Sequence, residues 1–369
     1  MKKLLIISSY FRPGYKAGGP IKSVNNLASE LGEDLDVYIL TRNHDLNEKK
    51  TYELPKNKWI KKDRFHVFYD DNNLRFKTYN KIKLTEFDFI YLNSLFSKST
   101  IQFLILNRNC KNIFLSPRGE LGEGALNIKK KKKKLFLAIA KLFSIYKHVH
   151  FIGSSNLEVK EIKKYFPRNK VNEISNFSDL SEYKFINKKM ENKLNLFFIS
   201  RITKKKNLEF LLNIMKYIDG EVNLKIIGPA EDTNYYEKCK EIVESLPRNI
   251  NVKFIGSVNP SELHNLVKND DYFILPTLNE NYGHVIAEAI SFKKPIIISD
   301  QTPWNEYITK NKLGHVLSLE NDLWINTLKK SLELDNATYN EYNKNFEVVE
   351  NSFREKNKET KKQYLRIFK

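Results

Sequence analysis

Short apolar runs typical of β-strands alternate with segments of helical periodicity along the whole chain. In the first half the strand-like runs are residues 4–8, 37–41, 88–92, 112–116 and 149–153, with helical patterns at 21–31, 135–145 and 156–165. The second half has strand-like runs at 194–200, 222–227, 251–255, 272–275 and 295–299, with helical patterns at 208–217, 235–246, 260–269 and 283–292. This alternation predicts an α/β protein whose parallel sheets are covered by helices on both faces.

The length and one polar gap divide this pattern into two domains. A chain of 369 residues exceeds one average domain. Residues 181–193 are polar and have no clear period, so we expect a linker there. Residues 1–180 and 194–340 then form two Rossmann-like, doubly wound domains, followed by a C-terminal helix over 341–369. Such sheets bind ligands at the carboxyl ends of their strands, so we expect the domains to face each other across a cleft.

Composition narrows the classes of partner. The two cysteines, Cys110 and Cys239, lie far apart without metal-ligand spacing, which indicates free thiols in a reducing compartment. No run reaches the roughly 18 apolar residues of a membrane span, and the apolar start is too short for a signal peptide. The net charge of +19 favours an anionic partner. A general bias of the genome towards Lys, Asn and Ile explains part of that charge equally well.

A loop after the buried run 272–275 carries the first candidate residues. Glu280, Asn281, Tyr282 and Gly283 occupy this loop, and Glu288 lies within the helix that follows. Eight helical residues span about 12 Å, comparable to the distance from the sugar to the ribose of a nucleotide sugar. Each carboxylate would then accept hydrogen bonds from a vicinal diol. By spacing alone, two glutamates eight apart also occur by chance in a charged chain.

A second set of candidates follows the first strand of the second domain. Arg201 leaves the end of that strand, and Lys206 precedes the next helix. A guanidinium and an ammonium together would stabilise a diphosphate leaving group. The alternative for Lys206, within a run of three lysines, is a solvated surface charge.

The first domain offers two glycine-containing turns after strands. Gly18 and Gly19 precede a helix and allow a backbone to approach an anion at its N-terminus, although a plain structural turn fits almost as well. Arg118, Gly119 and Glu120 follow the run 112–116, and we interpret them as acceptor-side residues because loops after strands commonly carry binding groups.

Six consecutive lysines run from Lys129 to Lys134, ahead of the apolar segment 135–143. Such a segment docks on an anionic membrane leaflet, or it is a buried core helix with a solvated basic start. The histidines indicate no metal site, because His148 and His150 lack further ligands nearby. His284 follows Gly283 and is either a contact to donor or acceptor or a structural residue at a helix start.

With these motifs in order, nearly the whole chain resembles the family-4 retaining glycosyltransferases of the GT-B fold. Glu280 and Glu288 match the family's E-x7-E motif, and Arg201 with Lys206 match its phosphate-binding pair. Supporting matches are Gly18-Gly19, Gly228 in Ile226-Ile227-Gly228-Pro229, Phe254-Ile255-Gly256, and Ser154-Ser155 with Glu158.

The resemblance implies a role for each of these residues. Glu280 contacts the donor sugar, Glu288 the ribose, and Arg201 with Lys206 the diphosphate. It further implies that no metal is required, and that the last helix crosses back to the first domain. Two positions depart from the family pattern: Phe177 stands where many members have glycine after Asn176, and Asn93 where many have histidine. Because position 93 is asparagine, we assign no acceptor-side role to a histidine.

Together with these residues, the resemblance implies a retaining, metal-independent hexosyltransferase without a cofactor. Its donor is a nucleotide diphosphate sugar, and its acceptor is a growing lipid-linked oligosaccharide of a bacterial surface polysaccharide, O-antigen or capsule. We expect it in the cytoplasm, peripheral on the cytoplasmic face of the inner membrane if the lysine run docks there. The alternatives are a sugar-nucleotide epimerase or phosphorylase on the same fold, and a basic nucleic-acid-binding protein. No nucleic-acid partner is expected, because the lysines lack interleaved stacking aromatics.

Overall fold

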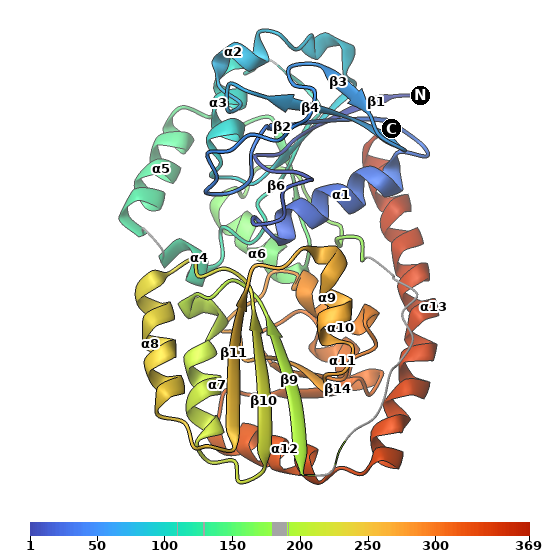
Figure 1. The fold of residues 1–369 in the computed structure, drawn as a ribbon. Helices are drawn as coiled ribbons and strands as arrows, with labels where there is room; N and C mark the ends of the chain where they lie inside the picture. The colour runs from blue at the N-terminus through green and yellow to red at the C-terminus, as the bar shows by residue number, and fades with distance from the viewer. Residues whose placement is uncertain (109, 128–129, 179–189, 191) are drawn as a thin grey trace. The chain divides into compact units, whose positions relative to one another are not determined.

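The computed structural model describes residues 1–108, 110–127, 130–178, 190 and 192–369. It contains two compact units: unit 1 comprises Met1–Phe177 and Asn357–Lys369, and unit 2 comprises Ser178–Lys356. The linker expected at 181–193 lies almost entirely outside the described residues. Each unit is an α/β layer structure with one sheet, as the alternating pattern predicted (Figure 1).

Unit 1 is built on an eight-stranded sheet of order β3-β4-β2-β1-β5-β6-β7-β8. All neighbouring strands are parallel except β3 and β4, which are antiparallel. The strands are β1 (Lys3–Ile7), β2 (Asp36–Arg42), β3 (Trp59–Lys61), β4 (Phe65–Asp70), β5 (Phe89–Asn93), β6 (Ile113–Ser116), β7 (Val149–Gly153) and β8 (Val171–Glu173). The connecting helices are α1 (Gly19–Leu31), α2 (Phe76–Tyr79), η1 (Leu84–Glu86), α3 (Lys98–Leu106), α4 (Glu123–Asn127), α5 (Lys130–Leu142) and α6 (Asn156–Tyr165).

Strand β1 shows why this sheet needs cover on both faces. Leu4 and Ile6 pack into one hydrophobic cluster with α1 and the end of the last helix, whereas Leu5 and Ile7 pack into a second cluster with α3 and α6. All four side chains are completely buried. Burial of such a side chain contributes about 2 kcal/mol, so the alternation along the strand forces helices onto both sides.

Unit 2 has a six-stranded, wholly parallel sheet of order β11-β10-β9-β12-β13-β14. The strands are β9 (Lys193–Ile199), β10 (Glu221–Ile227), β11 (Ile250–Gly256), β12 (Tyr272–Leu275), β13 (Ile296–Ser299) and β14 (Gly314–Leu317). The helices are η2 (Lys204–Lys206), α7 (Leu208–Met215), α8 (Thr233–Glu244), α9 (Pro260–Val267), α10 (His284–Ser291), α11 (Asn305–Lys310), α12 (Asn321–Glu333) and α13 (Asn336–Ile367). The strand order reverses at β9, so right-handed connections place α7 and α8 on one face and α9, α10 and α11 on the other (Figure 1).

The last helix is longer than the sequence analysis expected. It begins at Asn336 rather than at 341, and its residues through Lys356 group with unit 2, while its final residues group with unit 1. Tyr364 and Phe368 pack into the unit 1 cluster that also contains Leu4 and Ile6.

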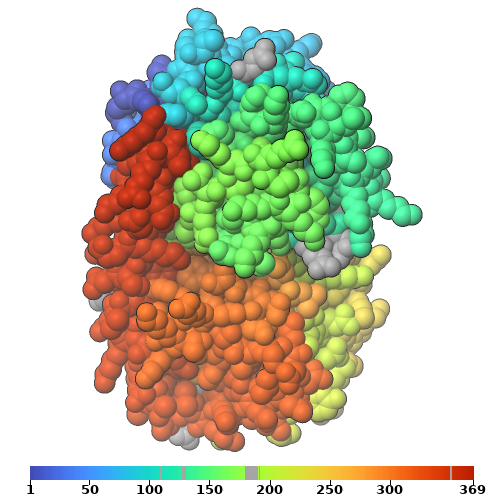
Figure 2. Space-filling model, turned by 180° about the vertical axis from the view of Figure 1, so that it is seen from behind, coloured from blue at the N-terminus to red at the C-terminus, as the bar shows by residue number. Residues whose placement is uncertain are grey.

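Helix α5 tests one of the two interpretations of the lysine-rich segment. It starts at Lys130, within the lysine run, and Lys129 lies outside the described residues. Ala140 is its only buried residue among those described, so the expectation of a buried core helix is wrong. The helix lies at the outer margin of unit 1 (Figure 2), where Phe136 and Leu137 pack against the core and Leu135, Ile139 and Leu142 are exposed. Among the described residues, no helix is both long and apolar enough to cross a membrane.

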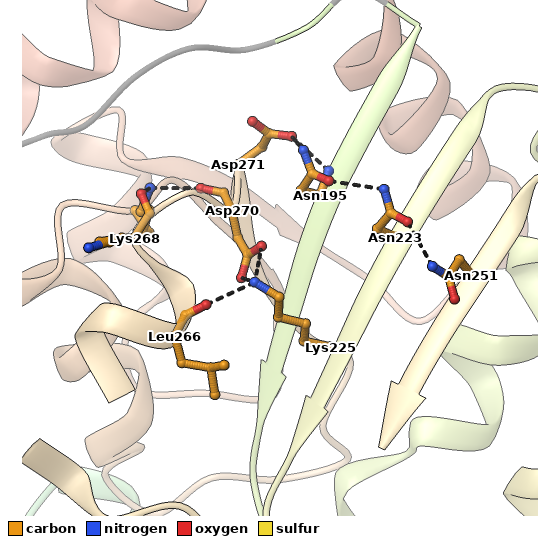
Figure 3. Close-up of polar contacts among 9 residues, drawn as sticks. Asn195, Asn223, Lys225, Asn251, Leu266, Lys268, Asp270 and Asp271 are labelled. Atoms are coloured by element: carbon orange, nitrogen blue, oxygen red, sulfur yellow. Dashed lines mark hydrogen bonds and ion pairs between the residues drawn. The ribbon is translucent and has the colours of Figure 1, made fainter. Parts of the chain in front are cut away.

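The amino-terminal ends of β9, β10 and β11 carry a ladder of asparagines (Figure 3). Asp271 accepts hydrogen bonds from the backbone N–H of Asn195 (2.7 Å) and from its side-chain amide (3.2 Å). Asn223 donates to Asn195 at 3.1 Å, and Asn251 donates to Asn223 at 3.1 Å. The ladder therefore fixes the register of three adjacent strands at their amino-terminal ends.

Two lysines lie beside this ladder. Lys225 donates to both carboxylate oxygens of Asp270, at 2.9 and 3.1 Å. Lys294 donates to the backbone carbonyls of Lys268 (2.6 Å) and Asp270 (2.7 Å). Burial raises the pKa of Asp270 to about 6 and lowers the pKa of Lys294 to about 8. These charges hold the start of β12 in place and lie at the end of the sheet away from the candidate residues.

Candidate functional site

Three loops of unit 2 leave the carboxyl ends of adjacent parallel strands. Arg201 follows β9, Gly228 follows β10, and Glu280 lies in the loop after β12. Because β9 lies between β10 and β12 in the sheet, these loops emerge side by side at the carboxyl ends of the strands. The topology therefore groups residues that are up to 79 positions apart in the sequence.

Lys206 and Glu280 form an ion pair in this group. Only 12% of the Lys206 side chain and 10% of the Glu280 side chain are exposed, so the interpretation of Lys206 as a solvated charge is wrong. Backbone hydrogen bonds hold the Glu280 loop on both sides: Leu278 donates to the carbonyl of Lys205 (2.9 Å), and Glu280 donates to that of Gln301 (2.9 Å). The ammonium and the carboxylate are thus preset by the fold.

Arg201 has a different partner and a wetter environment. Its guanidinium donates to Glu231, from the loop after β10, at 2.6 Å, and both side chains are more than two-fifths exposed. An exposed guanidinium with one carboxylate partner retains N–H groups that can bind a further anion.

Gly228 lies directly against the loop that carries Arg201. A Cβ atom at Gly228 would be 2.0 Å from the carbonyl oxygen of Ser200, and its φ of +141° also requires glycine. Packing of the two loops is therefore enough to explain glycine at this position.

The turn before α10 places the rest of the predicted donor residues. Gly283 adopts φ +75° and forms the N-cap of α10, which begins at His284. Glu288 is half-buried in the second turn of that helix. The 12 Å estimate assumed a continuous helix from Glu280, whereas residues 281–283 form a bend. The spacing of the two glutamates is therefore set by this turn rather than by helical rise alone.

Tyr282 points into unit 2. Its side chain is 5% exposed, and its hydroxyl lies 2.6 Å from the Ser178 hydroxyl. The indole N–H of Trp304 donates to the Tyr282 carbonyl, and the His284 ring packs 4.7 Å from the Tyr282 ring. This arrangement indicates a structural anchor at Tyr282, which the sequence analysis had assigned to donor binding.

The Arg118 loop of unit 1 is held by two buried carboxylates. Glu158 accepts from the backbone N–H of Gly119 at 2.6 Å. Glu120 accepts from the backbone N–H groups of Leu95 (2.5 Å) and Phe96 (3.1 Å). Burial raises the pKa of Glu120 above its ordinary value, although these hydrogen bonds oppose that shift. The loop after β6 is thereby fixed to the loops after β5 and β7.

The guanidinium of Arg118 collects three acceptors. It donates to Asn93 (2.7 Å), Asn176 (2.5 Å) and the Tyr91 hydroxyl (3.0 Å). Asn93 and Asn176 lie at the two places where the sequence departs from the family pattern. The sequence analysis missed them as partners of Arg118, although Asn93 is the last residue of β5 and Asn176 follows β8 in the same sheet.

Gly18 and Gly19 open helix α1 in unit 1. Gly18 is the N-cap with φ +65°, and a side chain there would meet nothing within 4 Å. Asp45 fixes the preceding loop by accepting from the backbone N–H groups of Tyr15 (2.8 Å) and Lys16 (3.0 Å). The N-terminus of the helix is therefore sterically open, as an anion site requires.

The structure thus brings together Lys206 with Glu280, Gly228 with the Arg201 loop, and Arg118, Gly119 and Glu120 within one bonded loop. In the part of the chain that the structure describes, no group of three or more His, Cys, Asp or Glu side chains could hold a metal ion.

Comparisons with known proteins show which family and which structures this chain resembles. Residues 179–347 match the family described as glycosyl transferases group 1. A 41.2 kDa protein in the cps region of Klebsiella pneumoniae is 23% identical over 253 residues, which cover 65% of this chain and 67% of that protein. The capsular polysaccharide biosynthesis glycosyltransferase CapM of Staphylococcus aureus is 26% identical over 155 residues, 39% of this chain and 40% of that protein.

Solved structures show the same fold at low sequence identity. Sucrose-phosphate synthase of Thermosynechococcus elongatus superposes with a TM-score of 0.77 at 15% identity, covering 100% of this chain and 99% of that one. Anabaena HepE, solved with UDP and glucose, gives 0.71 at 15% identity, with 99% of both chains covered. Residues 179–347 therefore resemble the glycosyl transferases group 1 family, and the chain as a whole has the GT-B fold of these solved structures.

Proposed function

We propose that this protein transfers a hexose from a nucleotide diphosphate sugar to a growing lipid-linked oligosaccharide, with retention of the anomeric configuration. The product belongs to a bacterial surface polysaccharide, O-antigen or capsule. The buried Lys206–Glu280 pair carries the proposal, because it presets a cation and a carboxylate at the strand ends where doubly wound sheets bind ligands. The CapM and cps-region relatives and the HepE structure with UDP and glucose support it.

Each donor residue has a distinct role in the proposal. Lys206 and Arg201 bind the diphosphate and stabilise its charge as the glycosidic bond breaks. Glu280 accepts hydrogen bonds from sugar hydroxyls, and Glu288 accepts them from the ribose. In unit 2, Asn281 and the backbone at Gly283 and Gly228 line the donor site. In unit 1, we assign anion binding to the open helix start at Gly18 and Gly19.

The reaction follows a front-face route. The departing diphosphate takes the acceptor proton, so neither a covalent enzyme nucleophile nor a bound metal or cofactor is needed. Arg118, Gly119, Glu120 and His284 belong to the acceptor side. Arg118 is rigid because three hydrogen bonds fix it, which suits recognition of a polar acceptor group.

The acceptor's lipid anchor brings the enzyme to the cytoplasmic face of the inner membrane, and helix α5 is the docking surface. Leu135, Ile139 and Leu142 lie on one helical face and are 63%, 42% and 78% exposed. Lys131 and Lys132 are exposed in the turn before them. An outward apolar stripe with adjacent lysines matches an anionic leaflet, into which the apolar residues insert while the lysines contact headgroups.

Vesicle sedimentation tests this surface. The protein should bind vesicles of phosphatidylglycerol more strongly than vesicles of phosphatidylcholine, and less strongly at high salt. Leu135→Ser with Leu142→Ser should abolish binding. Val348→Ser, at a position 68% exposed on α13, is the matched control and should bind as wild type. Unchanged binding of the double α5 variant would refute the docking surface.

A thermal-shift screen against UDP-, GDP-, ADP- and TDP-sugars tests the donor. The matching sugar nucleotide should raise the melting temperature, because at 100 times its Kd it adds about 2.7 kcal/mol to the free energy of unfolding. The variant with both Glu280→Ala and Glu288→Ala should remain folded but lose transfer. The wild-type protein should transfer the sugar equally well with and without EDTA. Wild-type transfer by that variant would contradict the site.

The same assays separate the alternatives. Conversion of the donor without acceptor would indicate an epimerase, and dependence on free phosphate a phosphorylase. Salt-dependent binding to oligonucleotides without any response to nucleotide sugars would indicate a nucleic-acid-binding protein.

A further inference from the structure

The chain passes between the two units at two points, after Phe177 and after Lys356. The residues on the unit 2 side of these crossings are Ser178 and Lys356. They are 178 positions apart in the sequence, yet both are connected to Tyr282. Every contact described below lies within unit 2.

The first connection is a buried pair of hydroxyls. The Ser178 and Tyr282 hydroxyl oxygens are 2.6 Å apart, and both residues are 5% exposed. A hydrogen bond shielded from water in this way is sensitive to the loss of either partner, because the remaining hydroxyl stays buried.

The second connection runs through Trp304. Its indole N–H donates to the Tyr282 carbonyl, and the two rings pack at 5.5 Å. On α13, Phe353 stacks on Trp304 at 5.8 Å, and the Lys356 ammonium lies 5.3 Å from the centre of the indole ring. The crossing in α13 is thus connected to the Tyr282 backbone, and the crossing at Ser178 to its side chain.

Tyr282 is two residues after Glu280 in the same loop. Before Tyr282, the loop is held by backbone hydrogen bonds to Lys205 and Gln301. Lys206 holds the Glu280 carboxylate directly, and Tyr282 holds the chain two residues further along, so the orientation of the carboxylate depends on both.

Given the proposed function, we infer that Tyr282 is a positioning residue, which couples both chain crossings to Glu280 and governs the transfer step rather than the affinity for the donor. Its hydroxyl is occupied by Ser178 and its carbonyl by Trp304. A group held in this way orients the loop without touching the sugar nucleotide.

A double-mutant cycle tests this role. Tyr282→Phe and Ser178→Ala each remove one side of the hydroxyl pair, and Ser178→Thr retains the hydroxyl. Tyr307→Phe is the control for loss of a tyrosine hydroxyl, because Tyr307 makes an exposed hydroxyl pair with Ser352 at 2.5 Å, outside the loop. For each variant, calorimetry gives the Kd for the best sugar nucleotide of the thermal-shift screen, starting with UDP-glucose. Release of the nucleoside diphosphate in the presence of a lipid extract gives kcat.

The expected result is a fall in kcat of about fivefold for Tyr282→Phe and for Ser178→Ala, the equivalent of one net hydrogen bond. The double variant should fall no further, and the Kd should change by less than about twofold. Ser178→Thr and Tyr307→Phe should turn over as wild type.

Three results overturn the inference alone: an unchanged kcat in Tyr282→Phe, a Kd that weakens as much as kcat/KM falls, or single effects that multiply in the double variant. A wild-type protein that neither binds nor turns over any sugar nucleotide overturns the proposed function, and the inference falls with it.

Discussion

Replacing Glu280 by glutamine removes one charge from a buried ion pair while nearly keeping the shape of the side chain. Lys206 and Glu280 are only 12% and 10% exposed, whereas Arg201 and Glu231 form a similar pair with side chains 45% and 42% exposed. Glu231→Gln is therefore a matched control in which the same chemical change occurs in water.

The burial sets the expected magnitude. Removing one partner of a buried pair costs about 3–5 kcal/mol, because the other charge remains buried and unpaired. The glutamine oxygen still accepts a hydrogen bond, so we expect Glu280→Gln to lower the free energy of unfolding by about 2–3 kcal/mol. Glu231→Gln should cost at most about 1 kcal/mol, as exposed pairs do. Adding Lys206→Met to Glu280→Gln should recover part of the loss.

Urea unfolding followed by tryptophan fluorescence measures these differences, since Trp304 and Trp324 both report on unit 2. The functional readouts should separate as well. Glu280→Gln should retain binding of UDP, because Lys206 keeps its charge, but should lose transfer from the sugar nucleotide. Equal losses of stability in Glu280→Gln and Glu231→Gln would refute the reasoning from burial, and wild-type transfer by Glu280→Gln would refute the role of the carboxylate.

Three further variants test the packing of the candidate loops and of the sheet that carries them. Gly228→Ala should cost about 3 kcal/mol or more in urea unfolding, because its Cβ would lie 2.0 Å from the carbonyl oxygen of Ser200; Gly256→Ala, with φ +80° but open space around it, should cost only about 1 kcal/mol. Lys294 has a pKa of about 8 in the folded protein against 10.5 in the unfolded chain, so the unfolded state binds more protons between these values. The wild-type free energy of unfolding should therefore gain about 3 kcal/mol relative to Lys294→Met as the pH rises from 8 to 10.5, and parallel pH profiles would contradict this. In Arg118→Lys, the single ammonium cannot reach all three acceptors of the guanidinium. This variant should have a lower melting temperature and a weaker response to acceptor, while its Kd for UDP-glucose stays unchanged.

The strands in the interior of each sheet could be predicted from the sequence. Runs such as 149–153 and 272–275 coincide with β7 and β12, because a strand buried on both faces must be continuously apolar. β3, β8 and β14 were missed, since strands of three or four residues at a sheet edge are too short to show a period. β4 is six residues long, but His66 and Asp70 interrupt its apolar pattern.

The candidate residues were predicted by type and position, but their partners were not. The sequence placed Lys206 and Glu280 in two loops, yet nothing in the sequence indicated that they pair across 74 positions. The helical spacing of Glu280 and Glu288 was wrong because the bend ending at Gly283 interrupts it. The inward direction of Tyr282 depends on Ser178 and Trp304, which lie 104 positions before it and 22 after it.

The sequence by itself determined the alternation of strands and helices, the glycines at turns, and the types of charged residue at strand ends. Those features follow from local sterics and from which side chains avoid water, both of which act over a few neighbouring residues. Only the tertiary structure decided which charges are buried, which hydroxyls pair, and which apolar side chains of α5 are left exposed. Such properties depend on the order of strands in a sheet, which brings together residues that no local pattern connects.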